Sequence, residues 1–132
     1  MFLAKSEFKL VPEGERRMLV EKIELLPTEK NVLFVKTTFV DTAGGGRILD
    51  TCNLSNPIGM YVLRSRFDVA TDNKYKDMDE IDSSDIVKAF EKKIFMCNVV
   101  HREGKGANEG KQYANINRVI SLCDTAVGND LE

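Results

Sequence analysis

Residues 31–57 read NVLFVKTTFVDTAGGGRILDTCNLSNP, and this stretch decides the fold. Its first part, 32–40, is β-branched and aromatic almost throughout, which is typical of a β-strand. The glycine-rich run 41–46 predicts a flexible turn, and 47–54 predicts a shorter strand that completes a hairpin. The closing Asn-Pro then opens a helix, because Asn is a favoured N-cap and Pro is favoured in the first turn.

Beyond this hairpin the sequence predicts helical residues first and strands afterwards. Apolar residues recur at helical spacing at first and then give way to β-branched and aromatic runs. The predicted elements are, in order, a helix over 56–67, a surface loop over 68–82, a short helix over 83–91, a strand over 93–101, a glycine-containing loop over 102–111 and a strand over 113–120.

The segment before the hairpin, 15–26, fits two patterns. Leu19, Ile23 and Leu26 have the spacing of one helix face. The same residues also divide into two stretches of strand alternation, with a one-residue slip at 21–22 that a β-bulge would produce. The local pattern leaves both interpretations open.

The order of elements favours the strand. Three strands, a helical insertion and two further strands make up the order of a five-stranded barrel of the OB type, in which a bulged first strand helps the sheet to bend. We therefore predict a mainly β fold, a five-stranded OB-like barrel with a helical insertion between strands three and four. An open, sandwich-like α+β domain with the same order is the alternative. One domain is expected over 1–123, followed by a short acidic tail over 124–132 whose final Leu-Glu is typical of a vector scar.

Composition points to an ordinary soluble domain. The chain has 132 residues, of which 42 % are hydrophobic and 30 % are charged, and no apolar run approaches the length of a membrane span. The 3 cysteines are scattered and the only histidine is His101, so neither a disulfide nor a structural zinc site is expected. Unpaired cysteines favour a reducing cytoplasm.

The sequence carries no recognisable enzyme motif. It lacks G-x-S-x-G, H-E-x-x-H and the Gly-Lys-Ser/Thr ending of a phosphate-binding loop. The carboxylates of 77–85 fall in one polar stretch, which favours a solvated loop over a catalytic metal site. We therefore expect neither catalysis nor a cofactor.

The charge is unevenly distributed along the chain. Overall the net charge is −2, but residues 68–91 carry −5 and residues 92–118 carry +4. Such a division can orient an anionic ligand toward one face, although a solvated charged surface would have the same composition.

Binding of single-stranded nucleic acid needs a basic groove and exposed aromatic faces. Strand alternation assigns Phe34 and Lys36 to the ligand side of their strand, and Val35 and Phe39 to the core. Core packing is the alternative for the aromatic residues, and solubility is the alternative for the lysines. The candidate DNA-binding residues are Phe34, Lys36, Arg47, Lys93, Phe95, Arg102, Lys105, Lys111 and Tyr113.

Four short motifs carry a family resemblance. They are Pro-Glu-Gly-Glu at 12–15, Asp-Thr-Cys-Asn-Leu-Ser-Asn-Pro at 50–57, Lys-Lys-Ile at 92–94 and Tyr-Ala-Asn-Ile-Asn-Arg-Val at 113–119. Over roughly residues 6–120 the chain resembles a family of small phage and prophage proteins that bind single-stranded DNA through an OB-like fold.

The resemblance implies a function as well as a fold. It implies binding of single-stranded DNA with little sequence preference, in phage-type DNA replication or recombination in the cytoplasm of a bacterial host. It also implies replication or recombination proteins as partners, homo-oligomers as a usual state, and no membrane role. The alternative is a protein-interaction or assembly module on the same barrel, because a fold does not fix a function.

Overall fold

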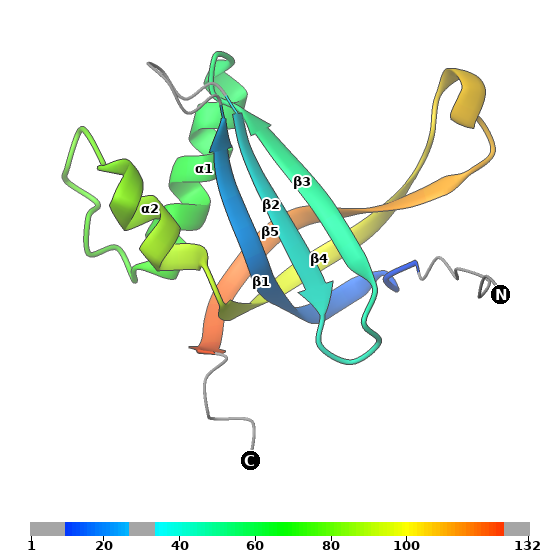
Figure 1. Ribbon diagram of the computed structural model, residues 1–132, viewed down its shortest axis with the longest axis horizontal. Helices are drawn as coiled ribbons and strands as arrows, with labels where there is room; N and C mark the ends of the chain where they lie inside the picture. The colour runs from blue at the N-terminus through cyan, green and yellow to red at the C-terminus, as the bar shows by residue number, and fades with distance from the viewer. Residues whose placement is uncertain (1–9, 27–33, 126–132) are drawn as a thin grey trace, which may run out of the picture.

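The computed structural model describes residues 10–26 and 34–125, and its five strands form one antiparallel sheet in the order β3-β2-β1-β4-β5 (Figure 1). The elements are β1 (Gly14–Leu26), β2 (Phe34–Asp41), β3 (Arg47–Asn53), α1 (Pro57–Ala70), α2 (Ser83–Phe90), β4 (Lys93–Glu103), the 3₁₀ turn η1 (Gly106–Asn108) and β5 (Gln112–Thr125).

Strand β1 is the centre of the sheet and is bulged where the sequence predicted it. Its first half, Gly14 to Leu19, pairs with β4, and Met18 to Leu26 pairs with β2. The register with β2 shifts between Val20 and Lys22, which confirms a strand with a bulge and excludes the helix. The bulge lets one long strand serve both halves of a curled sheet.

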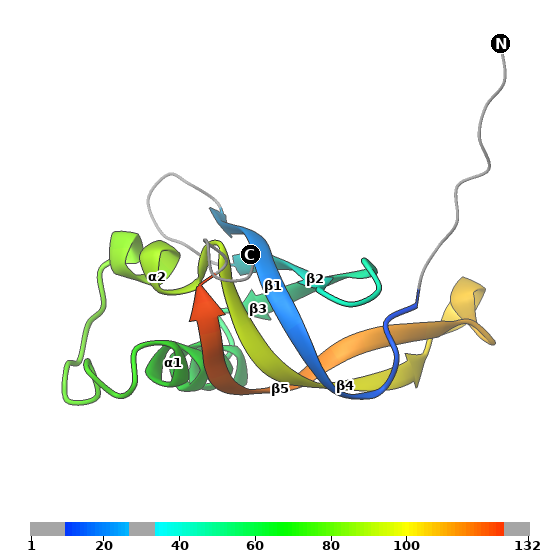
Figure 2. The same ribbon diagram turned by 90° about the horizontal axis from the view of Figure 1, so that it is seen from below.

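The curled sheet is open along one seam. Within residues 10–26 and 34–125, β3 pairs with β2 alone and β5 pairs with β4 alone. Strands β1, β2 and β3 cross over β4 and β5, as Figure 1 and the turned view in Figure 2 show. The predicted OB-like barrel is therefore confirmed as a partly open one, with helix α1 between β3 and β4.

Helix α1 begins where Asn56 and Pro57 predicted it. The side-chain oxygen of Asn56 accepts a hydrogen bond of 2.8 Å from the backbone N–H of Ile58. The helix starts so close to the end of β3 that a Cβ on Gly59 would lie 2.0 Å from the carbonyl oxygen of Asn53. Only glycine fits this approach, which fixes the direction in which the helix leaves the sheet.

One face of α1 packs against the barrel, and this face includes a buried charged residue. Leu63, Phe67 and Ala70 are buried, and so is Arg66 on the same face. The guanidinium of Arg66 donates a hydrogen bond of 2.5 Å to the carboxylate of Asp50 on β3. The ion pair satisfies a charge that burial alone would make unfavourable.

Two boundaries differ from the sequence prediction. Helix α1 continues to Ala70, so it includes the first residues of the predicted loop 68–82. Strand β5 continues to Thr125, so the residues expected to begin the tail extend the sheet instead. The rest of the predicted tail, 126–132, lies outside the described residues. Within the described chain, neither helix has the length and apolarity that a bilayer crossing requires.

Candidate nucleic-acid interface

Strand β2 presents Phe34 and Lys36 on the outside of the barrel. The Phe34 side chain is 40 % exposed, and Lys36 is exposed two residues further along the strand. Val35 and Phe39 are buried on the opposite side, at 1 % and 2 % exposure. The predicted division of this strand into an outer and an inner face is therefore confirmed.

The cations of the outer face differ in whether they form an ion pair. Lys36 pairs across the sheet with Glu24 and Thr51, but it makes no ion pair with any described residue. Glu24 instead forms an ion pair with the neighbouring Lys22, with an N–O distance of 3.2 Å. Among the described residues, Lys36 thus has no ion pair that a phosphate would have to displace.

Arg47, at the start of β3, is held by an acid. Its Nε and a terminal guanidinium nitrogen each donate a hydrogen bond of 3.1 Å to the carboxylate of Glu21. The hydrogen bond from Arg47 lowers the pKa of Glu21 below its usual value and raises the pKa of Arg47. Both side chains are exposed to solvent, where such pairs are weak enough for a phosphate to compete.

A groove lies along the open seam between β3 and β5. Its volume is about 370 Å³. It is lined by Leu10 and Val11 from the segment before β1, Arg47 and Leu49 from β3, and Tyr113 and Asn115 from β5. The Leu49 side chain is 69 % exposed and the Tyr113 ring is 38 % exposed, so the groove offers apolar surface to solvent. The structure brings the predicted residues Arg47 and Tyr113 to one place.

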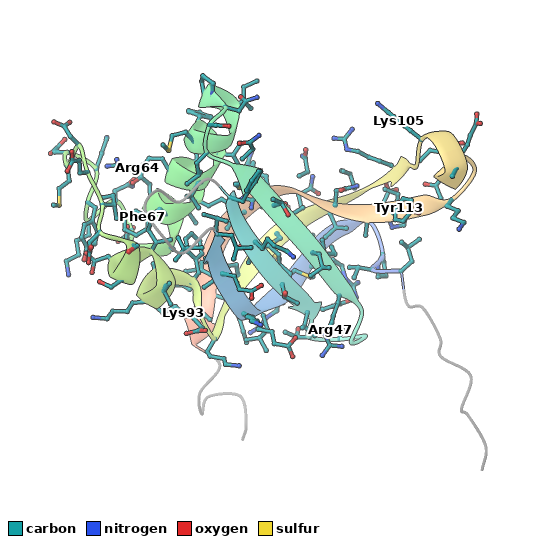
Figure 3. All side chains as sticks on the ribbon, turned by 45° about the horizontal axis from the view of Figure 1, so that its top comes forward. Arg47, Arg64, Phe67, Lys93, Lys105 and Tyr113 are labelled. Atoms are coloured by element: carbon teal, nitrogen blue, oxygen red, sulfur yellow. The ribbon has the colours of Figure 1, made fainter. Side chains whose placement is uncertain are left out.

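The arm formed by the ends of β4 and β5 extends this groove. Arg102 is the cross-strand partner of Tyr113, and both are exposed. Lys105 and Lys111 lie near the η1 tip and are also exposed. Figure 3 shows Tyr113 and Lys105 on this arm, which projects away from the helices.

Lys93 does not join this surface. It lies at the first residue of β4, near the α2 end of the molecule, whereas Tyr113 and Lys105 lie on the arm at the other end (Figure 3). Its side chain is half-buried. The other exposed candidate residues lie on the outer face of β2 and β3, at the seam and on the arm.

The prediction for Phe95 is wrong. Its side chain is 0 % exposed and its ring lies 5.7 Å from that of Phe90, so it cannot stack on a base. Phe95 shares its strand face with Cys97 and Val99, which are also buried, whereas Asn98 on the other face is only half-buried. The polar Asn98 marks the outer face of β4, and Phe95 belongs to the other one.

Of the eight described residues that line the groove, six are not among the predicted DNA-binding residues, and Leu10, Val11 and Asn115 belong to these six. Leu10 and Val11 precede the first strand, and no local pattern shows that this segment crosses the seam. The side chain of His101 contacts the carbonyl oxygen of Val11 at 2.7 Å, which ties the segment to β4. Asn115 was predictable, because it lies two residues after Tyr113 and strand side chains alternate.

The buried thiols form no part of this interface. Cys52 and Cys97 are both enclosed in the core. Burial raises the pKa of Cys97 to about 12 and also raises that of Cys52, against the opposing effect of Arg66. Buried thiols that stay neutral are poor nucleophiles.

Compared with protein-family models and with curated protein sequences, the chain matches none. The geometry and chemistry of the interface therefore carry the functional argument.

Proposed function

We propose that this protein binds single-stranded DNA with little sequence preference and without catalysis, and that it protects or organises the strand in phage-type DNA replication or recombination. The observation that carries the proposal is the groove at the β3–β5 seam, where Tyr113 and Arg47 line the same open edge. An aromatic face and a cation side by side are the two groups that a base and its phosphate require.

The surroundings of the groove support the same ligand. Phe34 and Lys36 repeat the pairing of a ring with a cation on the outer face of β2. Arg102, Lys105 and Lys111 continue it along the arm. A ligand that crosses all three places must be extended, which suits a single strand better than a duplex, whose bases are already stacked.

The distribution of charge gives the ligand a direction. Three of the six cations of 92–118, Arg102, Lys105 and Lys111, lie on the arm, and Arg47 lines the seam. The segment 68–91, which spans the end of α1, the loop after it and α2, carries a net charge of −5. In Figure 1 the helices and the arm lie at opposite ends of the molecule. A polyanion is therefore attracted to the arm and repelled from the helices.

Fluorescence anisotropy with a labelled oligothymidine tests the proposal directly. The oligonucleotide is expected to bind more tightly than a duplex of the same length, with an affinity that falls as salt rises. Each neutralised phosphate adds about −0.7 to the slope of log K against log salt for a single strand. Absence of binding at low salt, or equal binding to the duplex, would refute the proposal.

A tyrosine pair supplies the matched variants. Tyr113→Ala removes the ring from the groove and is expected to weaken binding by about 1–3 kcal/mol, the range for one stacked base. Tyr61→Ala removes a ring from α1 that is more exposed, at 72 %, and is expected to leave the affinity unchanged. Equal effects of the two substitutions would show that the groove is not the binding site.

A further inference from the structure

A second cavity lies at the opposite end of the molecule from the arm. It has a volume of about 510 Å³ and is bounded by α1, α2, the loop between them and the end of β1. Its walls are mainly apolar, and Leu25, Leu54, Met60, Leu63, Phe67 and Ile86 contribute to them. A volume of this size is typical of a site that takes a small molecule or a peptide side chain.

The wall of the cavity formed by the loop is held in place by Arg64. A terminal nitrogen of its guanidinium donates hydrogen bonds of 2.8 Å to the carbonyl oxygen of Tyr75 and 2.7 Å to that of Met78. A second side of the same guanidinium faces Asp68 at 3.5 Å. The ring of Tyr75 also packs on Phe67, with 5.1 Å between the ring centres. These contacts hold the loop against α1, so the cavity is formed before any ligand binds.

The mouth of the cavity is acidic. Asp79 and Glu80 line it, and the segment 71–86 that contains them carries a net charge of −4. Among the described residues that line the cavity, Arg64 is the only cation, and its guanidinium already contacts Asp68 and the loop carbonyls. A ligand for this site must therefore be apolar where it enters the cavity and positive where it meets the mouth.

Two methionines widen the apolar surface around the mouth. Met60 on α1 and Met78 on the loop are each 51 % exposed. Methionine side chains are polarisable and flexible, and they are common on surfaces that bind peptides of varied shape. Large apolar side chains that stay in solvent beside a preformed cavity indicate a surface that another molecule covers.

We propose that this cavity, which we call the acidic cavity, binds a short peptide of a partner protein in which a large apolar residue is flanked by Lys or Arg. The apolar side chain enters between α1 and α2, and the flanking cations meet Asp79 and Glu80. Nucleic acid is excluded from the same place by its charge. The protein is then able to hold a basic peptide at one end while its arm holds another ligand.

The probe for this proposal is a fluorescein-labelled peptide, Lys-Lys-Leu-Phe-Lys-Lys, measured by fluorescence anisotropy with the full chain. Two further peptides separate charge from apolar contact: Lys-Lys-Ser-Gly-Lys-Lys keeps the charge, and Glu-Glu-Leu-Phe-Glu-Glu keeps the apolar pair. Only the first is expected to bind. Binding of the serine-glycine peptide with the same affinity, or no binding of any peptide, would overturn the proposal.

Matched variants locate the site. Met60→Lys puts a cation inside the acidic cavity and is expected to abolish binding, whereas Ile58→Lys adds the same charge on an exposed part of α1 outside the lining and should have a much smaller effect. Glu80→Lys is expected to weaken binding by about tenfold, because an exposed ion pair is replaced by a repulsion. Glu109→Lys on the arm serves as its control. Equal losses within either pair would contradict the assignment.

Two further measurements exclude other occupants. Sedimentation of the chain without peptide should show no self-association that Glu80→Lys abolishes; if it does, the acidic cavity belongs to a second copy and the peptide proposal is wrong. Tyr113→Ala, which changes the seam groove, should leave the peptide affinity unchanged. Loss of peptide binding in this variant would show that the peptide binds at the seam groove instead.

Discussion

The guanidinium of Arg47 makes two hydrogen bonds of 3.1 Å to the carboxylate of Glu21, 26 residues earlier in the chain. The pair joins the bulge of β1 to the start of β3, at the edge of the seam groove. The pair holds the guanidinium in a fixed place at the seam groove, which Tyr113 also lines. It also neutralises the positive charge of Arg47 that would attract a phosphate.

Glu21→Gln is therefore expected to strengthen binding of single-stranded DNA. The substitution leaves the side-chain shape and frees the positive charge of Arg47 for a phosphate, so the salt slope should steepen by about 0.7. Anisotropy titrations with oligothymidine at several salt concentrations measure both effects. Glu80→Gln removes the same charge at the acidic cavity and controls for net charge alone. An unchanged affinity and slope for Glu21→Gln would contradict the prediction that Glu21 shields Arg47 from the strand.

The two phenylalanines of β2 should separate stability from binding. Phe39 is enclosed in the core, so Phe39→Ala is expected to lower the free energy of unfolding by about 3–5 kcal/mol. Phe34→Ala should leave the melting temperature nearly unchanged and weaken DNA binding by about 1–3 kcal/mol. Thermal melts and binding titrations on both variants measure these effects. Unfolding caused by Phe34→Ala alone would contradict the observed faces of the strand.

The sequence was sufficient where a local signal has one structural solution. Asn56 and Pro57 predicted the start of α1, and the phase slip after Val20 predicted the bulge of β1. The predicted exposure of Phe95 is wrong, because the face of β4 that it shares with Lys93 also carries Cys97 and is buried beyond Lys93. Side-chain alternation divides a strand into two faces, but burial decides which face is the core.

Long-range relationships were beyond the sequence. No local sequence pattern indicates that Glu21 forms an ion pair with Arg47. The sequence therefore predicts Arg47 as a candidate cation without the partner that neutralises it. The seam groove depends on β3 and β5 lying side by side without pairing, which follows from how far β1 curls the sheet. The acidic cavity depends on Arg64 reaching carbonyls of a loop that has no regular structure of its own.

The buried ion pair between Arg66 and Asp50 should show a strongly non-additive mutational pattern. Arg66→Met keeps most of the packing but leaves Asp50 without its partner, so the loss is expected to be about 3 kcal/mol or more. Adding Asp50→Leu to Arg66→Met should recover most of that loss, because an apolar pair needs no charge compensation. Denaturant titrations of the two single variants and the double variant complete the cycle. Additive losses would show that the two side chains act independently.

Cys97 should make the protein less stable in alkali. Burial raises the pKa of its thiol from 9.0 to about 12, so between these values the unfolded chain loses a proton that the folded chain retains. The contribution of this thiol to stability is therefore fully present below about pH 9 and declines as pH rises, by up to roughly 1 kcal/mol per pH unit.

Cys97→Val isolates this contribution from the other groups that titrate in alkali. Valine is similar in size and has no proton to lose, so the variant should lose less stability than the parent when urea titrations at pH 8 and pH 10 are compared. Some alkaline dependence should remain in the variant, because burial raises the pKa of Cys52 in the same direction. Identical pH dependence in the two proteins would show that the thiol of Cys97 does not titrate differently on folding.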